Sequence, residues 1–524
     1  MKKIYLIFTA ALTLFVSACQ KTDFVEAYTD PSKISVTTVE KQFTGFLNAN
    51  KWYVLPDYWN YFVVLRTTLN RYNQAVGWAN SANQYIPGAA GVNDRWNNYY
   101  GFVAQYRELE KVYGKLSTTD QADRRIYMIA AAIYFYDHTQ KVVDLHGDIP
   151  MTEAGKLSIN GGDYDKSYPK YDTAEAIYTK MLDDLKAFSD ELNSINVQSG
   201  ILAGFKTQDF VNKGDLTLWK KYCNSLRLRI LMRASAASAF SARATSEIAD
   251  ILNNPSKYPT IGSNTENIQI GVYDLNTDIH AKNFRSGLED WDGNIAGKAM
   301  IDHMNKNADP RLRAMFEAGI NAKGVYNGLD PLLDNATQTA LIAGGTMAIY
   351  NRSTLSRNQF FPGMLMNAAE ASFIAAEYYL KANNAAAAKT AYEKGVRQSI
   401  EFYYNLRKLS NDNTAPTLTA YTEEEVSKYL ASADVSWDNA TDKLNLIATQ
   451  KWIHFSVVQP VDSWAEIRRL DLPKFNFQVD DANAQKQPPF RWNYPSSEQT
   501  YNATNYSSVK AKDNLSTKLF WDTK

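Results

Sequence analysis

The chain has 524 residues, of which 45% are hydrophobic and 21% charged, a composition typical of globular proteins. Lys and Arg together number 56, as do Asp and Glu, so no net electrostatic field draws the protein to nucleic acid or to anionic lipid. The length is about three times that of a usual domain, enough to bury a large core in one extended domain or two intimate ones.

The N-terminus has the pattern of a secretory signal. Two lysines precede an apolar run from Ile4 to Val16, which is too short for a comfortable membrane span. Small residues then lead directly into Cys19, as in a bacterial lipobox, where the cysteine is diacylated and becomes the mature N-terminus. The alternative is an ordinary signal with a chance cysteine. We expect a signal peptide over residues 1–18 and a polar, lipid-anchored tether over residues 19–35.

Apolar residues then recur at helical spacing. One predicted helix runs to about Val143, and Gly147 and Pro150 break the chain after it, before a surface loop. The next predicted helix covers residues 172–192 and starts with the capping-box-like sequence Asp172-Thr173-Ala174-Glu175.

The charged residues around the Gly-Asp-Ile-Pro turn and Cys223 are predicted to have structural roles. Short acids around the Gly-Asp-Ile-Pro turn, such as Asp144, are suited to accept backbone donors or to pair with Arg227, Arg229 and Arg233 of a later helix. Cys223, the only cysteine besides Cys19, falls in the apolar phase of that helix and is predicted to be an inert core thiol.

Two Ala-rich helical stretches follow in the C-terminal half. Residues 366–381 and 385–404 are joined by only three residues, which predicts an antiparallel hairpin of roughly tetratricopeptide size. Similar pairs at 101–143 and 172–235 suggest that helix pairs are the repeating unit. The predicted fold is therefore mainly α, with tetratricopeptide-like helix pairs, long irregular loops and few short strands.

The segment over about 253–361 interrupts this pattern. It is rich in Asn, Gly, Asp and aromatic residues, has no sustained period, and contains one short strand candidate at 268–272. Long irregular stretches in a compact fold are usually functional or disordered, and the aromatic content favours ordered, functional loops. We predict a single helical domain over 36–524 with this segment as an insertion.

Several phrases, in a fixed order over nearly the whole chain, resemble one protein family. They are Thr29-Asp30-Pro31, the run from Val143 to Ala154, Pro169-Lys170-Tyr171-Asp172, the run from Trp219 to Arg229, Asp309-Pro310-Arg311-Leu312, the run from Glu370 to Glu377, Gln450-Lys451-Trp452, the run from Trp464 to Arg469, Arg491, Tyr494-Pro495 and Glu498. With them the chain resembles the SusD/RagB-type (SusD-like) nutrient-binding outer-membrane lipoproteins of Bacteroidetes.

The resemblance implies an α-helical fold and a location on the outer membrane, held by lipid and facing the cell surface. It implies a TonB-dependent SusC-type β-barrel transporter as partner and capture of a nutrient, most often an oligosaccharide. It implies no cofactor and provides no residue-level ligand motif, so the resemblance does not identify the nutrient.

The sequence lacks the common motifs for catalysis. The five histidines match no zinc spacing, and no HExxH, CxxC, GxSxG, GxxxxGK or GxGxxG pattern occurs. Residues 290–294 resemble a calcium loop but lack the terminal Glu of an EF-hand. We expect no metal, no cofactor and no catalytic residue. A surface glycoside hydrolase remains an alternative because it needs only two carboxylates, and a helical protein-binding scaffold is another.

Binding without catalysis requires aromatic faces beside planar polar groups, and 13% of the residues are aromatic. Two clusters combine both types, although core packing explains many aromatic residues equally well. The candidate ligand-binding residues are Arg71, Tyr72, Trp78, Tyr85 and Trp96 in the first cluster, and Tyr273, Asn283, Trp291, Asp292 and Tyr350 in the second.

Overall fold

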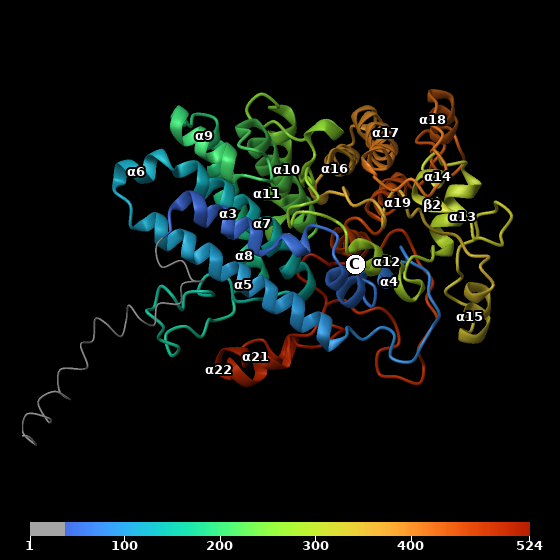
Figure 1. The fold of residues 1–524 in the computed structure, drawn as a ribbon, viewed down its shortest axis with the longest axis horizontal. Helices are drawn as coiled ribbons and strands as arrows, with labels where there is room; N and C mark the ends of the chain where they lie inside the picture. The colour runs from blue at the N-terminus through green and yellow to red at the C-terminus, as the bar shows by residue number, and fades with distance from the viewer. Residues whose placement is uncertain (1–36) are drawn as a thin grey trace, which may run out of the picture.

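The computed structural model describes residues 37–524, and helices dominate them, which confirms the predicted mainly α fold (Figure 1). The predicted signal peptide, the lipidation site Cys19 and the tether lie outside the described residues. The longer helices are α3 (Val39–Ala49), α5 (Ala89–Gly114), α7 (Arg125–His146), α8 (Ala174–Leu192), α9 (Ser199–Gln208), α10 (Leu216–Ala234), α11 (Ser238–Asn253), α13 (Lys298–Lys306), α15 (Asn335–Ala343), α16 (Ala368–Lys381), α17 (Ala385–Leu409), α18 (Glu423–Leu430), α19 (Lys443–Phe455) and α20 (Pro460–Leu470).

Short elements connect them. The short α-helices are α4 (Leu69–Tyr72), α6 (Thr118–Asp123), α12 (Phe284–Glu289), α14 (Leu312–Met315), α21 (Ser496–Tyr501) and α22 (Ala503–Tyr506). A π-helix, η2 (Trp59–Leu65), and the 3-10 turns η1 (Lys51–Tyr53), η3 (Asn264–Glu266), η4 (Asp290–Asp292) and η5 (Lys510–Lys512) complete the helical set. Two antiparallel strand pairs join β1 (Ile268–Ile270) to β4 (Gly363–Met366) and β2 (Phe316–Glu317) to β3 (Ile349–Tyr350).

The helices spread along the long axis of the molecule, with segments distant in the sequence side by side. In Figure 1, α3, α5 and α7 lie toward one end, α10, α16 and α17 follow, and α13 and α15 lie toward the other end. The hydrophobic core forms two large clusters on either side of α16. Ala371 and Ile374 of α16 pack into the first cluster, whereas Phe373 and Ala376 pack into the second. A helix apolar on both faces is a central element, and its alanines allow neighbours to approach closely.

Local sequence explains where several helices begin. The Thr173 side chain accepts a hydrogen bond from the Ala176 amide, so α8 starts where its capping residue predicts. The predicted hairpin is also confirmed: α16 and α17 pack together, and Asn384 caps α17. Gly395 of α17 lies so close to Phe373 that a Cβ would come within 2.6 Å of the ring. That position therefore requires glycine.

Other boundaries differ from the predictions. Helix α7 continues to His146, because its final turn is covered by later parts of the chain, and α17 continues to Leu409. The break after α7 is buried, since Gly147 to Met151 pack beneath the C-terminal segment, and the loop that follows it is largely exposed, as predicted. The segment 253–361 is less irregular than predicted and contains the four helices α12 to α15. These helices have four to nine residues, too few to show a sustained period.

A buried ionic network joins α7, α10, α16, α19 and α20. Its members are almost completely inaccessible and are Asp137, Asp144, Arg229, Arg233, Glu370, Glu377, Lys451, Glu466 and Arg469. Arg229 Nη1 lies 2.8 Å from Asp137 of α7, and its Nη2 lies 2.8 Å from Glu370 of α16. One guanidinium thus connects three helices.

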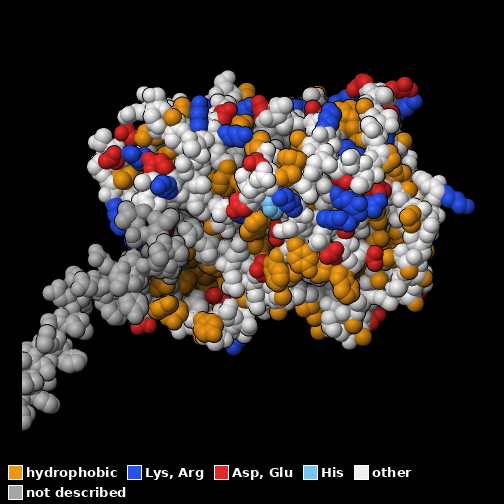
Figure 2. Space-filling model, in the orientation of Figure 1, with side chains coloured by type: hydrophobic (Ala, Val, Ile, Leu, Met, Phe, Trp, Pro, Cys, Tyr) orange, Lys and Arg blue, Asp and Glu red, His pale blue; other side chains and the backbone are white. Residues whose placement is uncertain are grey.

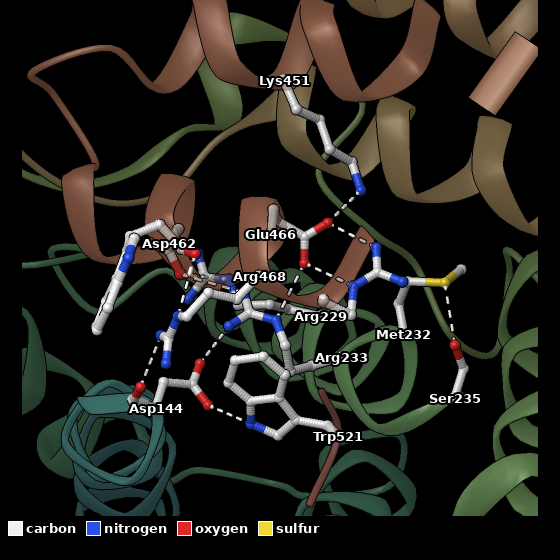
Figure 3. Close-up of polar contacts among 12 residues, drawn as sticks. Asp144, Arg229, Met232, Arg233, Ser235, Lys451, Asp462, Glu466, Arg468 and Trp521 are labelled. Carbon is white, nitrogen blue, oxygen red and sulfur yellow. Dashed lines mark hydrogen bonds and ion pairs between the residues drawn. The ribbon is translucent and has the colours of Figure 1, made fainter. Parts of the chain in front are cut away.

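The second half of the network centres on Glu466. Lys451 and Arg233 reach this carboxylate from opposite sides, at 2.8 and 3.0 Å (Figure 3). Arg469 bonds it as well and holds Glu377 through two bonds of 2.7 and 2.6 Å. Burial alone would raise the pKa of Glu377, but Arg469 and Lys451 outweigh it and hold the pKa well below its usual value of 4.5.

The variant Glu377→Gln should lower the free energy of unfolding by about 3–5 kcal/mol, because it leaves buried cations without their counter-charge. Chemical denaturation at pH 7 measures this loss. The matched control is Glu424→Gln, whose partner Lys428 is exposed like itself, and it should change the free energy by less than about 1 kcal/mol.

The difference in stability between wild type and Glu377→Gln depends on pH. Because the folded pKa of Glu377 lies below 4.5, its stabilisation is fully present above pH 4.5 and is lost as the pH falls toward the folded value. The gap between wild type and Glu377→Gln should therefore narrow below about pH 4.5. A gap that widens there would contradict the assigned ionisation.

Candidate functional site

The outer face of η2 and the nearby turn η4 form an exposed aromatic surface, defined by Tyr58, Trp59, Phe62 and Trp291. Trp59 is 46% exposed and Trp291 is 81% exposed. Figure 2 shows hydrophobic side chains gathered on this face of the molecule, in the area where Figure 1 draws α4 and α12. Single exposed aromatic side chains are common, but a contiguous exposed apolar patch often marks an interaction site.

The π-helical form of η2 separates its two faces. The Arg66 amide bonds the Tyr61 carbonyl, five residues back, at 2.9 Å. Tyr61 and Val64 face the core, while Phe62 remains partly exposed and stacks on Tyr58 with ring centroids 4.9 Å apart. π-helical turns are rare and are found often at functional sites.

Arg66 connects η2 to the turn that carries Trp291. Its Nη2 donates to the Trp291 carbonyl at 2.8 Å, and its guanidinium lies 4.8 Å from the Phe62 ring centre. Burial lowers the pKa of Arg66, against the opposing effect of Asp292 and Asp290. Trp291 itself has φ +56° and ψ +40°, a left-handed conformation that is uncommon for residues with a Cβ. The surrounding contacts therefore hold this indole outward.

Close backbone packing fixes the turn against η2. A Cβ at Gly293 would lie 2.8 Å from the Leu288 carbonyl oxygen, and one at Gly287 would lie 3.0 Å from the Tyr61 Cβ. The Gly293 position therefore excludes a side chain, and a side chain at Gly287 would require Tyr61 to shift. Glycine thus permits the close approach of α12 to η2.

Polar groups border the aromatic surface. Asn283 Nδ2 donates to Asp57 Oδ1 at 2.9 Å, and the other oxygen of Asp57 accepts from the Trp59 amide at 3.2 Å. Asp290 and Asp292 are exposed beside Trp291. Aromatic faces next to amide and carboxylate groups suit a ligand with both apolar faces and hydroxyl groups.

The first predicted cluster forms a separate small recess. Arg71 stacks on the indole of Trp78 and donates to the Gln84 carbonyl at 2.7 Å. The recess has a volume of about 30 Å³ and is bordered by Asn80 and Lys298. Both Arg71 and Trp78 are only partly accessible, so the cluster presents edges rather than a broad face.

Four of the predicted ligand residues lie in the core, and the prediction for them is corrected. Tyr72, Tyr85, Trp96 and Tyr350 are at most 2% exposed. The Tyr350 hydroxyl donates to the Ala75 carbonyl at 2.7 Å, so even its polar end is satisfied inside the protein. These side chains have no face left for a ligand, because they serve as core packing.

The second predicted cluster divides. Asn283, Trp291 and Asp292 are exposed and belong to the aromatic surface or its border. Tyr273 is 67% exposed but lies against Lys213, whose Nζ is 3.3 Å from the ring centre. It therefore lines another hollow, of about 280 Å³, with Lys213 and Asp274.

Sequence reasoning missed Tyr58, Trp59 and Phe62. The signal was present, because four of the five residues from Tyr58 to Phe62 are aromatic. An α-helical period does not separate their faces correctly, since the segment is a π-helix. Only the structure shows which rings of this run face outward.

The described residues offer little for catalysis or metal binding. No group of three or more His, Cys, Asp or Glu side chains within residues 37–524 could hold a metal ion. Cys223 is fully buried, its thiol donates to the Leu185 carbonyl, and burial raises the pKa of this thiol to about 12, as expected of an inert core residue. No helix within the same range is long and apolar enough to cross a membrane.

Comparison with known proteins identifies the family. The model of the SusD-like family described as "starch-binding associating with outer membrane" matches residues 47–495. The chain belongs to the SusD-like family. The resemblance inferred from the ordered sequence phrases is thereby confirmed.

Solved structures share the SusD-like fold. A chitin-binding protein is 20% identical with a TM-score of 0.73, over 92% of this chain and 100% of its own. A SusD-like protein of Bacteroidetes AC2a is 22% identical with a TM-score of 0.73, over 93% and 100%. A SusD homologue from Bacteroides fragilis is 22% identical with a TM-score of 0.70, over 93% and 100%. No curated protein matches the chain.

Substitution of two tryptophans should separate packing from surface roles. Trp96→Ala should lower the free energy of unfolding by about 3–5 kcal/mol, because it empties a core position. Trp291→Ala should change it by less than about 0.5 kcal/mol, because the ring is largely in solvent. Urea denaturation of the two variants measures both values, and equal losses would contradict the assigned environments.

Proposed function

We propose that this SusD-like protein captures an oligosaccharide on its aromatic surface and delivers it to a TonB-dependent SusC-type transporter in the outer membrane. The observation that carries the proposal is the exposed pair Trp59 and Trp291, held in place and bordered by Asn283, Asp57 and Asp292. Membership of a family described as starch-binding supports a carbohydrate ligand.

Sugar chemistry fits this surface. A pyranose ring has apolar C–H faces that cover an indole, and equatorial hydroxyls that bond carboxylates and amides. Burying on the order of 100 Å² on one indole contributes about 2.5 kcal/mol, whereas association costs at least about 4 kcal/mol. One ring is therefore too weak by itself. Two or three rings with a few hydrogen bonds give roughly micromolar to millimolar affinity, which suits a protein that must release its cargo.

The protein acts as a binding module without catalysis. The carboxylates at the border already interact with the protein. Asp57 accepts hydrogen bonds from Asn283 and from the Trp59 amide, and Asp292 lies beside Arg66. Delivery to a membrane transporter also requires that the protein stay at the membrane. Lipidation at Cys19 serves that purpose in this proposal, because two or three acyl chains are retained essentially permanently.

Alanine substitution at Trp59 or at Trp291 should weaken oligosaccharide binding about 5- to 30-fold each, since each removes one aromatic face worth about 1–2 kcal/mol net. Titration calorimetry with starch-derived and chitin-derived oligosaccharides measures the affinities. The control is Tyr164→Ala, which removes an equally exposed ring from the loop after α7 and should leave binding unchanged. Equal affinity in all four proteins would exclude this surface, and release of shorter sugars by the wild type would favour a hydrolase.

Native purification tests the partner and the anchor. The protein extracted from its own outer membrane in mild detergent should carry a large TonB-dependent barrel in stoichiometric amount, identified by mass spectrometry. The variant Cys19→Ser should lose labelled palmitate and leave the membrane fraction. A wild type that comes off the membrane alone would remove the transporter from the proposal.

A further inference from the structure

A cavity that is partly open to solvent lies beneath the aromatic surface, on the inner side of η2. Its volume is about 60 Å³, and its walls come from η2, α5, α7, the start of α20 and the C-terminal segment. The polar residues in these walls are Asn60, Arg95, Lys141, Gln459, Asp462 and Trp492. Its composition differs from that of an ordinary packing defect, which is apolar.

Arg95 of α5 is the most unusual of these side chains. It is 4% exposed, yet within residues 37–524 its guanidinium donates no hydrogen bond and pairs with no carboxylate, and Nη1 is fully buried. The guanidinium lies 4.4 Å from the ring centre of Tyr53. The adjacent Asp94 accepts the Tyr53 hydroxyl instead of pairing with the guanidinium. A buried cation without hydrogen bonds costs several kcal/mol, so this group requires an acceptor on the cavity side.

Further donors surround the same space. The indole Nε1 of Trp492 is fully buried and has no partner among the described residues. Lys141 Nζ lies 3.0 Å from Asp137, which leaves other ammonium donors free. Gln459 to Asp462 form the N-cap and first turn of α20, where backbone N–H groups have no acceptor within the helix and the helix dipole favours negative charge.

The single carboxylate in the walls is already compensated. Asp462 lies 3.7 Å from Arg229 and 4.0 Å from Arg233. Its Oδ2 also accepts a hydrogen bond from the side-chain amide of Gln459 at 3.3 Å. The close-up of the network shows Asp462 on the same side as these guanidinium groups (Figure 3). Asp462 thus faces two buried cations that also pair with Asp137, Glu370, Asp144 and Glu466. By contrast, Arg95 Nη1 and the Trp492 indole have no acceptor among the described residues.

We propose that this cavity is a binding site for a small inorganic monoanion of the size of chloride, held by Arg95, Lys141 and the Trp492 indole. A water needs about 10–15 Å³ measured in this way, so the cavity holds about four waters, or one halide with its remaining hydration. A sugar ring or a larger organic acid does not fit. Since Asn60 and Tyr61 of η2 line the cavity, the anion stabilises the segment that carries the exposed aromatics.

Bromide locates such a site directly because it replaces chloride and scatters anomalously. Crystals of the protein grown with sodium bromide should give an anomalous difference peak in the cavity, within about 3.5 Å of a nitrogen of Arg95 or Lys141. The absence of such a peak would overturn the proposal. Electron density in the cavity that water alone explains would also overturn it.

A second measurement works in solution. At constant ionic strength, replacing gluconate with chloride at ten times the dissociation constant should lower the unfolding equilibrium constant about tenfold, because chloride binds only the folded protein. Gluconate is too large to enter. Arg95→Met and the milder Trp492→Phe should lose most of this chloride effect. The control Arg397→Met, which removes an exposed arginine paired with Glu423, should keep it.

The proposal can still be rejected if Arg95→Met does not fold. In that case the wild-type bromide peak and the Trp492→Phe titration decide. A chloride effect that is the same in wild type and Trp492→Phe, together with no bromide peak, would assign the cavity to water.

Discussion

The buried ionic network is the constraint on which the rest of the structure depends. Helices from distant parts of the chain meet around Arg229, Arg233 and Glu466, and each charge in this region is matched by a partner on another helix. Such a network adds little net stability compared with an apolar core, but removing one member leaves a buried charge uncompensated. In this structure the paired charges link α7, α10, α16, α19 and α20 to one another.

The position of the candidate binding surface follows from this arrangement. The start of α20, held through Asp462 and Glu466, forms one wall of the cavity, and η2 covers it. Residues on one side of the π-helix contact the cavity and the core, while Trp59 and Phe62 face outward. Arg66 then ties the Trp291 turn to the same element. A rigid scaffold thus presents aromatic rings at a fixed spacing, which limits the entropy lost when a ligand binds.

Much of the helical framework could be predicted because its signals are local. Thr173 caps α8, and the short connection between α16 and α17 permits little except an antiparallel hairpin. The strand at Ile268 to Ile270 was also predictable from its residues. The helices within 253–361 have only four to nine residues, which carry too little periodicity to be predicted, and α7 runs further than predicted because later segments cover its last turn. The single-domain organisation stays a prediction.

The sequence by itself determined the helix-pair architecture, the inert environment of Cys223 and the family, because these depend on local spacing or on the order of whole phrases. Of the three arginines expected to pair with acids near the Gly-Asp-Ile-Pro turn, Arg233 does so, with Asp144, whereas Arg227 pairs with Glu247 and Arg229 with Asp137 and Glu370. Only the tertiary structure decided which aromatic residues are available to a ligand. Trp96 and Trp291 both occur among amide-rich neighbours, yet one is buried and the other is 81% exposed. Exposure is set by which distant segments cover a ring. The unpaired Arg95 is explained in the same way, because its surroundings come from five other parts of the chain, at 53–69, 141–145, 364, 458–462 and 492. Neither property is encoded within the few residues that surround the side chain.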